Sequence, residues 1–350
     1  MTTTEGHDRG QGGATLEAVA RVAGVSRATV SRVVNDSPRV SPEVRAAVES
    51  AIRELGYTPN RAARSLVTRR SDSIAVVITE PTGRLFSDPF FPRLVRGVAN
   101  ELAVRDMQLV LLMPERSEES RTVRYLTGGH VDGALLVSLH GDDPIPAALA
   151  ARGVPSVFVG RPPQGAEVSY VDVDNRQGGR RATTHLLEQG ASRVATIAGP
   201  EDMAAGVDRF EGWRDAIRAA GQEVDPSLVA RGDFTHEGGA AAMERLLKAA
   251  GHIDALFVAS DLMAAGALAV LAARGIRVPE DVLVVAFDDS PIAAATRPAL
   301  TSVRQPIEEL GREGIHLLLD TIERSGRPPR RVVLATELVT RASSKGRGRG

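Results

Sequence analysis

Cysteine is absent from the 350 residues of this chain, which excludes a disulfide framework and a thiolate metal site. Long hydrophobic runs are absent as well, since no segment approaches the roughly 18 apolar residues of a membrane span. The polar, glycine-rich beginning MTTTEGHDRGQGGA also lacks the apolar stretch of a signal peptide. We therefore predict a protein that stays in the cytoplasm and makes no contact with a membrane.

Catalytic motifs are missing too. The chain has no Gly-rich phosphate loop and no nucleophile elbow. Asp288 and Asp289 are adjacent in sequence, so in a strand their side chains face opposite ways and form no catalytic pair. His140 with Asp142 and Asp143 suggests a metal, but no second histidine cluster supports it, and a solvated loop is the favoured interpretation. These absences predict a protein that is not an enzyme and holds neither a cofactor nor a metal.

Positive charge is concentrated at the start of the chain. Residues 1–70 contain 11 Arg against 7 Asp or Glu, whereas the whole chain has a net charge of −1. An excess of this kind suits a module that meets phosphates. The other 280 residues or so are enough for a larger body, and a hydrophobic content of 43% can supply its core.

The basic region has the pattern of three short helices. Apolar residues at helical spacing run from Leu16 to Ala23, and Gly24 then interrupts them. Ser26 is placed to cap a second helix over residues 27–34. Ser41 is placed to cap a third helix, which has proline at its first position and ends at Gly56. The order helix, glycine turn, helix is typical of a helix-turn-helix.

The second helix carries side chains that suit DNA. Val30, with Val33 or Val34, forms its apolar face. The other face has residue types that reach base edges and phosphates in a major groove, namely Arg27, Ala28, Thr29, Ser31 and Arg32. A glycine turn between amphipathic helices also occurs in helical hairpins that never touch nucleic acid. The basic charge of the region favours the DNA-binding alternative.

Two runs in this region, TLEAVARVAGVSRATVSRVVN and VSPEVRAAVESAIRELGYTPNRAARSL, resemble the head of the lactose-repressor and galactose-repressor family nearly position for position. The resemblance continues through DPFFPRLVRGV, VDGALLVS, VDVDN, DRFEGWRDAI, LFVASDLMAAGAL, VVAFDDS and LTSVRQPIEELGREG. It implies an all-α helix-turn-helix head and an α/β, two-lobed body like that of periplasmic binding proteins. It also implies a homodimer on double-stranded operator DNA. We expect no tetramer, because the end of the chain lacks leucine heptads.

The resemblance further implies a hinge in residues 59–67. A segment this short is marginal as an isolated helix, so we expect it to order only when docked. In the family, two such helices pair over the minor groove, where a leucine at the position of Leu66 wedges between bases. The full set of predicted DNA contacts is Thr15, Leu16, Ser26, Arg27, Ala28, Thr29, Ser31, Arg32, Asn35, Tyr57, Asn60, Arg61, Ala63 and Leu66.

The rest of the chain alternates apolar strand runs, such as SIAVVIT, VDGALLVS, DALFVAS and VLVVAFD, with amphipathic helices. This alternation predicts two parallel sheets, each covered by helices. The predicted divisions are a disordered N-terminus in 1–13, a head in 14–58, a hinge and linker in 59–70, an effector-binding and dimerisation domain in 71–342, and a disordered basic tail in 343–350. The resemblance implies that the chain crosses between the lobes near Val173, Arg304 and Arg331, so that lobe 1 holds 71–172 and 305–330 and lobe 2 holds 173–304 and 331–342.

Residues at the carboxyl ends of the strands are candidate effector contacts, because ligands of open parallel sheets lie there. Asp88 beside Phe90 and Phe91 suits a sugar, whose hydroxyls form hydrogen bonds and whose C–H faces stack on rings. We expect one of the two rings to be core and the other to touch the ligand. Asp288, at the end of VVAFD, is the strongest single candidate. Arg161 follows the fourth strand, where it either bonds the ligand or closes the lobes.

The resemblance adds two roles to this set. Arg209 falls where the family has an arginine that holds ligand hydroxyls, and Phe234 falls where relatives stack an aromatic on the ligand. The predicted effector-binding residues are Glu80, Asp88, Phe90, Phe91, Ser138, His140, Arg161, Arg209, Phe234, Ser260, Asp261 and Asp288.

The resemblance predicts a repressor of carbohydrate-utilisation genes that a mono- or oligosaccharide releases from a pseudo-palindromic operator. Relatives with similar VGRP and DPFF segments respond to oligosaccharides such as cellobiose. Many relatives have asparagine where this chain has Asp88 and Ser260, so we expect an effector of different shape or hydroxyl pattern. Two alternatives stay open, namely a regulator with a purine or nucleoside corepressor and a sugar-binding transport component.

Overall fold

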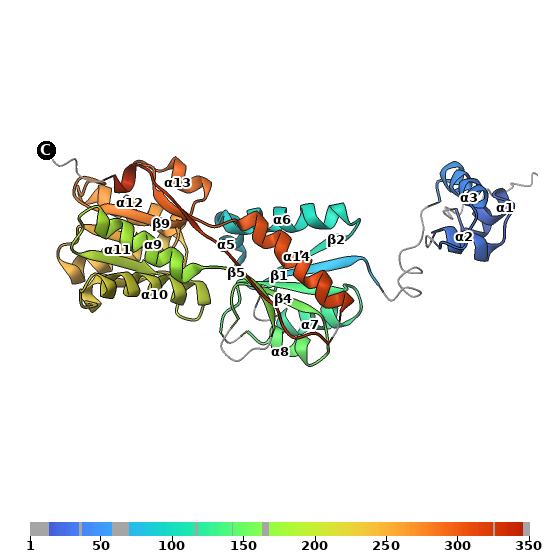
Figure 1. Cartoon of the computed structure of the whole chain (residues 1–350), viewed down its shortest axis with the longest axis horizontal. Coiled ribbons are helices and arrows are strands. Elements are labelled where there is room, and N and C mark those ends of the chain that lie inside the picture. The colour runs from blue at the N-terminus through green and yellow to red at the C-terminus, as the bar shows by residue number, and fades with distance from the viewer. Residues whose placement is uncertain are drawn as a thin grey trace, which may run out of the picture. The chain divides into compact units, whose positions relative to one another are not determined.

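The computed structural model describes residues 14–34, 37–57, 70–115, 118–141, 143–162, 168–324 and 326–345. The chain forms two compact units, Met1–Ser71 and Asp72–Gly350, which we call the head and the body (Figure 1). The predictions of a disordered N-terminus and of a hinge helix in 59–67 lie outside the described residues. In the described ranges, no helix combines the length and the apolar character that a membrane span needs.

The head consists of three helices, α1 (Leu16–Val22), α2 (Arg27–Val34) and α3 (Pro42–Leu55). Hydroxyl side chains begin two of them as the sequence predicts, because Ser26 accepts a hydrogen bond from the Thr29 amide and Ser41 accepts one from Val44. Gly56 ends α3 in the left-handed conformation, with φ of 60°. Val19, Val30 and Val48, one from each helix, are fully buried in the small core. The predicted helix-turn-helix is confirmed.

Lobe 1 of the body is a six-stranded sheet in the order β11-β5-β4-β3-β1-β2, in which every pairing is parallel. Its strands are β1 (Ser73–Ile78), β2 (Gln108–Leu112), β3 (Gly133–Val137), β4 (Ser156–Val159), β5 (Ser169–Val173) and β11 (Arg331–Leu334). Its helices are α5 (Thr82–Ser87), α6 (Phe90–Val104), α7 (Glu119–Thr127), α8 (Ile145–Ala150) and α14 (Ile307–Glu323). The short helix α5 is not predicted by the sequence pattern.

The period-2 geometry of a strand explains why lobe 1 has two cores. On β1, Ile74, Val76 and Ile78 pack under α6 and α14, which lie side by side in Figure 1. Ala75 and Val77 point to the other face, where α7 and α8 cover them. A strand that is buried on both faces needs a continuous apolar run, which is the pattern that SIAVVI shows.

Lobe 2 is a second six-stranded sheet, in the order β12-β10-β9-β8-β6-β7. Its strands are β6 (Val194–Ala198), β7 (Val229–Arg231), β8 (Ala255–Val258), β9 (Leu283–Asp288), β10 (Thr301–Arg304) and β12 (Glu337–Val339). All pairings are parallel except that of β10 with β12. Its helices are α9 (Asn175–Glu188), α10 (Ala204–Ala219), α11 (His236–Ala250), α12 (Asp261–Ala273) and α13 (Pro291–Ala295). The predicted α/β body of two sheets is confirmed.

The chain crosses between the lobes three times (Figure 1). The first crossing follows β5, and the second separates β10 from α14, as the sequence predicts. The third needs correction. Residues Arg331–Leu334 form β11 and pair in parallel with β5 of lobe 1, so the crossing lies between Leu334 and Glu337 rather than at Arg331.

The predicted start of the disordered tail at residue 343 is also wrong. Ser343 and Ser344 are fully buried in a 3-10 turn. The Ser343 hydroxyl donates to the Val284 carbonyl at 2.6 Å and accepts from the Thr301 amide at 2.8 Å. Residues 343–350 include no apolar side chain, but hydroxyls that form hydrogen bonds with backbone groups of strands can be buried without one. The tail residues 346–350 lie outside the described part of the chain.

Two glycines set the distance between α9 and α10. A Cβ atom on Gly212 of α10 would lie 2.1 Å from the carbonyl oxygen of Arg176, and one on Gly179 of α9 would lie 2.4 Å from that of Arg209. Only glycine on both helices permits this approach. The contact matters for the site described below, because α9 begins with Asn175 and α10 carries Arg209.

We expect Gly212→Ala to destabilise the body by about 1–3 kcal/mol, because the added methyl group forces apart two helices whose backbones are in contact. Urea unfolding measures the effect. Gly83→Ala is the control, since no atom lies within 4 Å of its added Cβ, and it should be neutral or stabilising by up to about 1 kcal/mol. Equal stability of the two variants would contradict the packing argument.

Candidate functional site

The exposed face of α2 gathers most of the predicted DNA contacts that the structure describes. Val30 and Val33 are buried, while Arg27, Ala28 and Arg32 are exposed and Thr29 and Ser31 are half-buried. Arg27 lies 3.1 Å from Glu17 of α1, but both side chains are largely exposed, so the ion pair contributes little to stability. A guanidinium in such a pair can exchange its partner for a phosphate or a base.

Four other predicted contacts of the head have structural roles or partial burial. Tyr57 is buried in the core of the head, which removes its ring from the surface. Leu16 is half-buried against the same core, and Thr15 caps α1 by accepting from the Ala18 amide. The Ser26 hydroxyl bonds that of Thr29 at 2.9 Å. The remaining predicted contacts, Asn35, Asn60, Arg61, Ala63 and Leu66, lie outside the described residues.

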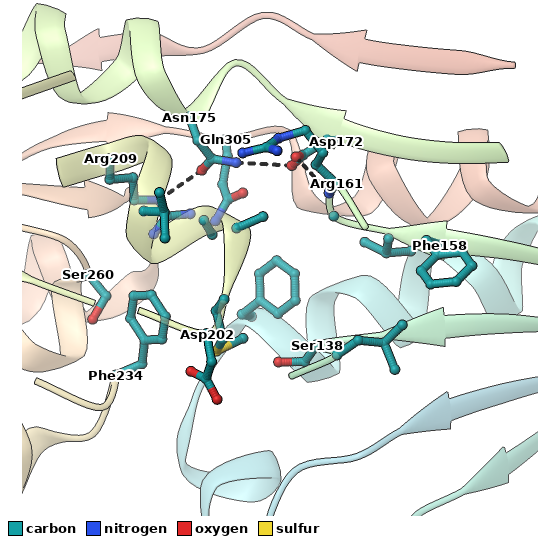
Figure 2. Close-up of a pocket in the computed structure, with 18 of the residues that line it drawn as sticks. Ser138, Phe158, Arg161, Asp172, Asn175, Asp202, Arg209, Phe234, Ser260 and Gln305 are labelled. Atoms are coloured by element: carbon teal, nitrogen blue, oxygen red, sulfur yellow. Dashed lines mark hydrogen bonds between the residues drawn. The ribbon is translucent and has the colours of Figure 1, made fainter. Parts of the chain in front are cut away.

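A cavity of about 370 Å³ lies where the carboxyl ends of strands from both lobes face each other (Figure 2). Its volume is within the range of small-molecule sites. The structure brings nine of the twelve predicted effector-binding residues to its wall, namely Asp88, Phe90, Phe91, Ser138, Arg161, Arg209, Phe234, Ser260 and Asp288. Lobe 1 supplies the first five of these and lobe 2 the other four.

Arg209 is the polar centre of the cavity and is 5% exposed. Its Nε donates to Asn175 Oδ1 at 2.8 Å, and one terminal nitrogen donates to the Ala259 carbonyl at 2.7 Å and to Asp288 Oδ1 at 3.2 Å. The guanidinium also lies 3.7 Å from the centre of the Phe287 ring. These partners hold the Arg209 guanidinium in one orientation, and its N–H donors lie in one plane because the group is planar.

Asp288 is the carboxylate that faces Arg209. It also accepts a hydrogen bond from Gln305 at 2.7 Å, and burial raises the pKa of its carboxyl to about 7. Asp261, another predicted contact, does not line the cavity. It is buried behind the wall, where it accepts from the Ser290 amide and the Ser302 hydroxyl, both at 2.6 Å. Asp261 therefore supports the loop after β9 rather than facing a ligand.

Asp172 and Asn175 belong to the cavity wall and were missing from the prediction. Asn175 donates to Asp172 at 3.0 Å, so the two link lobe 1 to Arg209 in the chain of bonds that Figure 2 shows. Asp172 also accepts from the Arg161 amide, and burial raises the pKa of its carboxyl to about 6. The motif VDVDN, which marks the end of β5, is the signal that could have identified both.

Aromatic rings line the cavity from both lobes. Phe91 is almost fully buried and Phe90 is half-buried, with ring centres 5.3 Å apart in a T-shaped pair. This division agrees with the expectation that one ring is core, although both reach the cavity wall. Phe234 of lobe 2 faces this space (Figure 2), and Phe158 of lobe 1 also belongs to the wall, although its ring is part of the core under α7 and α8. Rings beside fixed hydrogen-bonding groups are the combination that suits a sugar.

Glu80 and His140 line a neighbouring cavity instead of this one. The solvated loop predicted around His140 is wrong for this residue, because its imidazole lies 3.5 Å from Glu80 and 2.6 Å from Asp202 of lobe 2. The hydrogen bond to Glu80, followed by that to Asp202, raises the pKa of His140 to about 9. Glu80 is nevertheless tied to the first cavity, since it accepts from Ser138 at 2.5 Å.

A second polar contact joins the lobes at the mouth of the cavity. Arg161, after β4 of lobe 1, forms a two-fold contact with Asp208 of α10, at 2.7 and 3.2 Å. The two alternatives for Arg161 are therefore combined in this structure, because it lines the cavity and also bridges the lobes. This pair and that of His140 with Asp202 are ionic contacts between the lobes.

Family models of known proteins match segments of both the head and the body. Residues 15–60 match the model of bacterial regulatory proteins of the lacI family, and residues 183–344 match that of a periplasmic binding protein-like domain. The HTH-type transcriptional regulator CelR of Thermobifida fusca is 54% identical over 94% of this chain and 98% of its own length. The ribose operon repressor of Escherichia coli is 35% identical over 95% of this chain and its own full length.

Solved structures of transcriptional regulators are also similar to this chain. One of them, a complex of the transcriptional regulator CelR with cellobiose, has a TM-score of 0.77 and 51% identity over 94% of this chain and 99% of its own. A lac repressor dimer bound to operator and to the anti-inducer ONPF has a TM-score of 0.82 and 29% identity, over 95% of this chain and 99% of its own.

The His140 contacts predict a pH dependence. Because the folded pKa of about 9 is above the ordinary value of 6.5, the stability from this group is complete below about pH 6.5 and is lost as the pH rises through 9. The free energy of unfolding of the wild type should therefore fall relative to His140→Gln between pH 6.5 and 9.5. Urea titrations at several pH values measure this difference, and a difference that stays constant with pH would contradict the assignment.

Proposed function

Because the chain belongs to the lacI family of bacterial regulatory proteins, we propose that it is a repressor that cellobiose, or a closely similar disaccharide, releases from its operator. The regulated genes would then serve carbohydrate use. The proposal involves no catalytic step. The identity of 54% to a CelR regulator, over nearly the whole of both chains, supports the choice of effector class.

The observation that carries the proposal is the composition of the cavity between the lobes. Arg209 and Asp288 offer a fixed donor fork and a carboxylate acceptor for neighbouring hydroxyls, while Phe90 and Phe234 offer ring faces for the C–H side of a sugar. A cavity of about 370 Å³ has room for a small saccharide. Asp88 and Ser260 supply further polar atoms at positions where, by the family resemblance, many relatives have asparagine.

On the DNA side, we propose that two copies of the chain place their α2 helices in successive major grooves of a pseudo-palindromic site. Arg27 and Arg32 are exposed on that helix and suit base edges or phosphates. Leu66 of the predicted hinge would act as the minor-groove wedge that the family resemblance implies. The lac repressor dimer on its operator, with the same fold, supports this arrangement.

Effector and operator binding would be coupled through the angle between the lobes. The ionic contacts at Arg161 and His140 hold the lobes in the arrangement seen here, and a ligand that favours this arrangement shifts the population toward it. Couplings of this kind typically amount to about 1–3 kcal/mol and act equally in both directions.

We expect the protein to bind the promoter upstream of its own gene, and cellobiose to weaken that binding by about 5- to 150-fold. Fluorescence anisotropy at fixed salt measures both, with monosaccharides, other disaccharides and purines as comparison ligands. Arg32→Ala is the matched control, which should lose specific DNA binding and keep cellobiose binding. A purine that strengthens binding would instead support a corepressor, and no response to any sugar would overturn the proposal.

We expect Asp288→Asn to separate the two activities. The amide cannot accept a charge-assisted hydrogen bond from the ligand and from Arg209, so the Kd for cellobiose should rise at least about tenfold while operator affinity stays unchanged. Calorimetry measures the first quantity and anisotropy the second. Asp215→Asn, which breaks an exposed pair with Arg176 outside the cavity, is the control. Wild-type affinity for cellobiose in Asp288→Asn would remove Asp288 from the site.

A further inference from the structure

We infer that Arg84 of α5 divides the effector cleft into two chambers and thereby sets the length of saccharide that the protein accepts. The inference rests on the proposed function, since it takes the effector to be a saccharide. It concerns a residue that the sequence did not single out, on a helix that the sequence did not predict.

Arg84 is the residue that both cavities share. On one side lies the cavity of about 370 Å³ with Arg209 and Asp288. On the other lies a larger cavity of about 750 Å³, whose wall includes Glu80, His140, Asp233 and Thr235. Carboxylate and hydroxyl groups of this kind accept hydrogen bonds from sugar hydroxyls. The larger cavity is thus chemically suited to further sugar units.

The Arg84 side chain is held in place from several directions. A terminal nitrogen donates to Glu80 at 2.5 Å, and the guanidinium lies 5.8 Å from the centre of the Phe91 ring and 5.1 Å from that of Phe234. Phe91 belongs to lobe 1 and Phe234 to lobe 2, so the guanidinium fills the space between the lobes. A planar cation beside two rings is stabilised there by cation–π contacts.

One N–H donor of the buried Arg84 side chain has no hydrogen-bond partner in the described part of the chain. The Arg84 side chain is only 10% exposed, yet its Nε has no hydrogen-bond partner among the described residues. A buried N–H without a partner is unfavourable, because the water that it gave up on burial is not replaced. Since Arg84 lines the first cavity, a turn of its side chain toward that cavity would let a hydroxyl of the bound saccharide accept this hydrogen bond. The same side chain would then bond the last ring of a short effector and exclude a longer one.

The test compares cellobiose with cellotriose, by calorimetry on the full-length dimer. We expect the wild type to bind cellotriose at least about tenfold more weakly than cellobiose, and Arg84→Ala to reduce this ratio to about threefold or less. Arg84→Ala should also bind cellobiose itself about tenfold more weakly, because the Nε hydrogen bond is lost. Arg84→Lys keeps a cation beside Glu80, so it should lose cellobiose affinity and retain the preference for the shorter sugar. Arg176→Ala, outside both cavities, is the matched control.

The outcomes distinguish the inference from the proposed function. If the wild type binds neither sugar, the proposed function fails and the inference fails with it. If the wild type binds cellobiose and Arg84→Ala leaves the ratio of the two affinities unchanged, only the inference is overturned. Arg84→Met replaces Arg84→Ala if circular dichroism shows that the alanine variant does not fold, because its uncharged side chain also removes the contacts to Glu80.

Discussion

A buried guanidinium organises the junction of the two lobes. Burying an unpaired charge is very costly, so the surroundings of Arg209 have to supply a counter-charge and acceptors for its donors. They come from different elements: Asn175 begins α9, the Ala259 carbonyl follows β8, and Asp288 ends β9. The glycine contact between α9 and α10 brings the first of these within reach. Removing any one partner would leave a buried charge partly unpaired, which ties the packing of lobe 2 to the chemistry of the cavity.

The contacts between the lobes have a different character from those inside each lobe. Each sheet has its own apolar core, whereas Arg161 with Asp208 and His140 with Asp202 join the lobes across the cleft. Half-exposed ion pairs contribute much less than an apolar interface would. The arrangement of the lobes therefore depends on small free energies, which a ligand with a few hydrogen bonds can outweigh. Strong cores with weak lobe contacts are what a ligand-operated switch requires.

The sequence predicted those parts of the fold and site that depend on local pattern. Capping residues and a terminal glycine defined the helices of the head, and the rule that ligands lie at strand ends selected Asp88 and Asp288 for one cavity. The family resemblance added Arg209 to the same cavity. The sequence missed features that depend on long-range packing. Tyr57 has a polar hydroxyl and is among the predicted DNA contacts, whereas the structure buries this residue in the small core of the head. Arg84 has no pattern to mark it, because the six residues of α5 are too few for helical periodicity to appear.

Backbone strain at the strand ends connects the cavity to the crossings between the lobes. Ser138, Phe234 and Asp288 all line the cavity with positive φ, at 58°, 66° and 109°, which side chains other than glycine adopt at a cost. Asp289 follows with φ of 50°, and its carboxylate accepts from Arg304 at 2.7 Å, at the second crossing. The ligand-facing carboxylate of Asp288 is thus one peptide bond away from an ion pair that holds a crossing strand. A ligand bound to Asp288 would therefore contact strained backbone that lies next to the second crossing between the lobes.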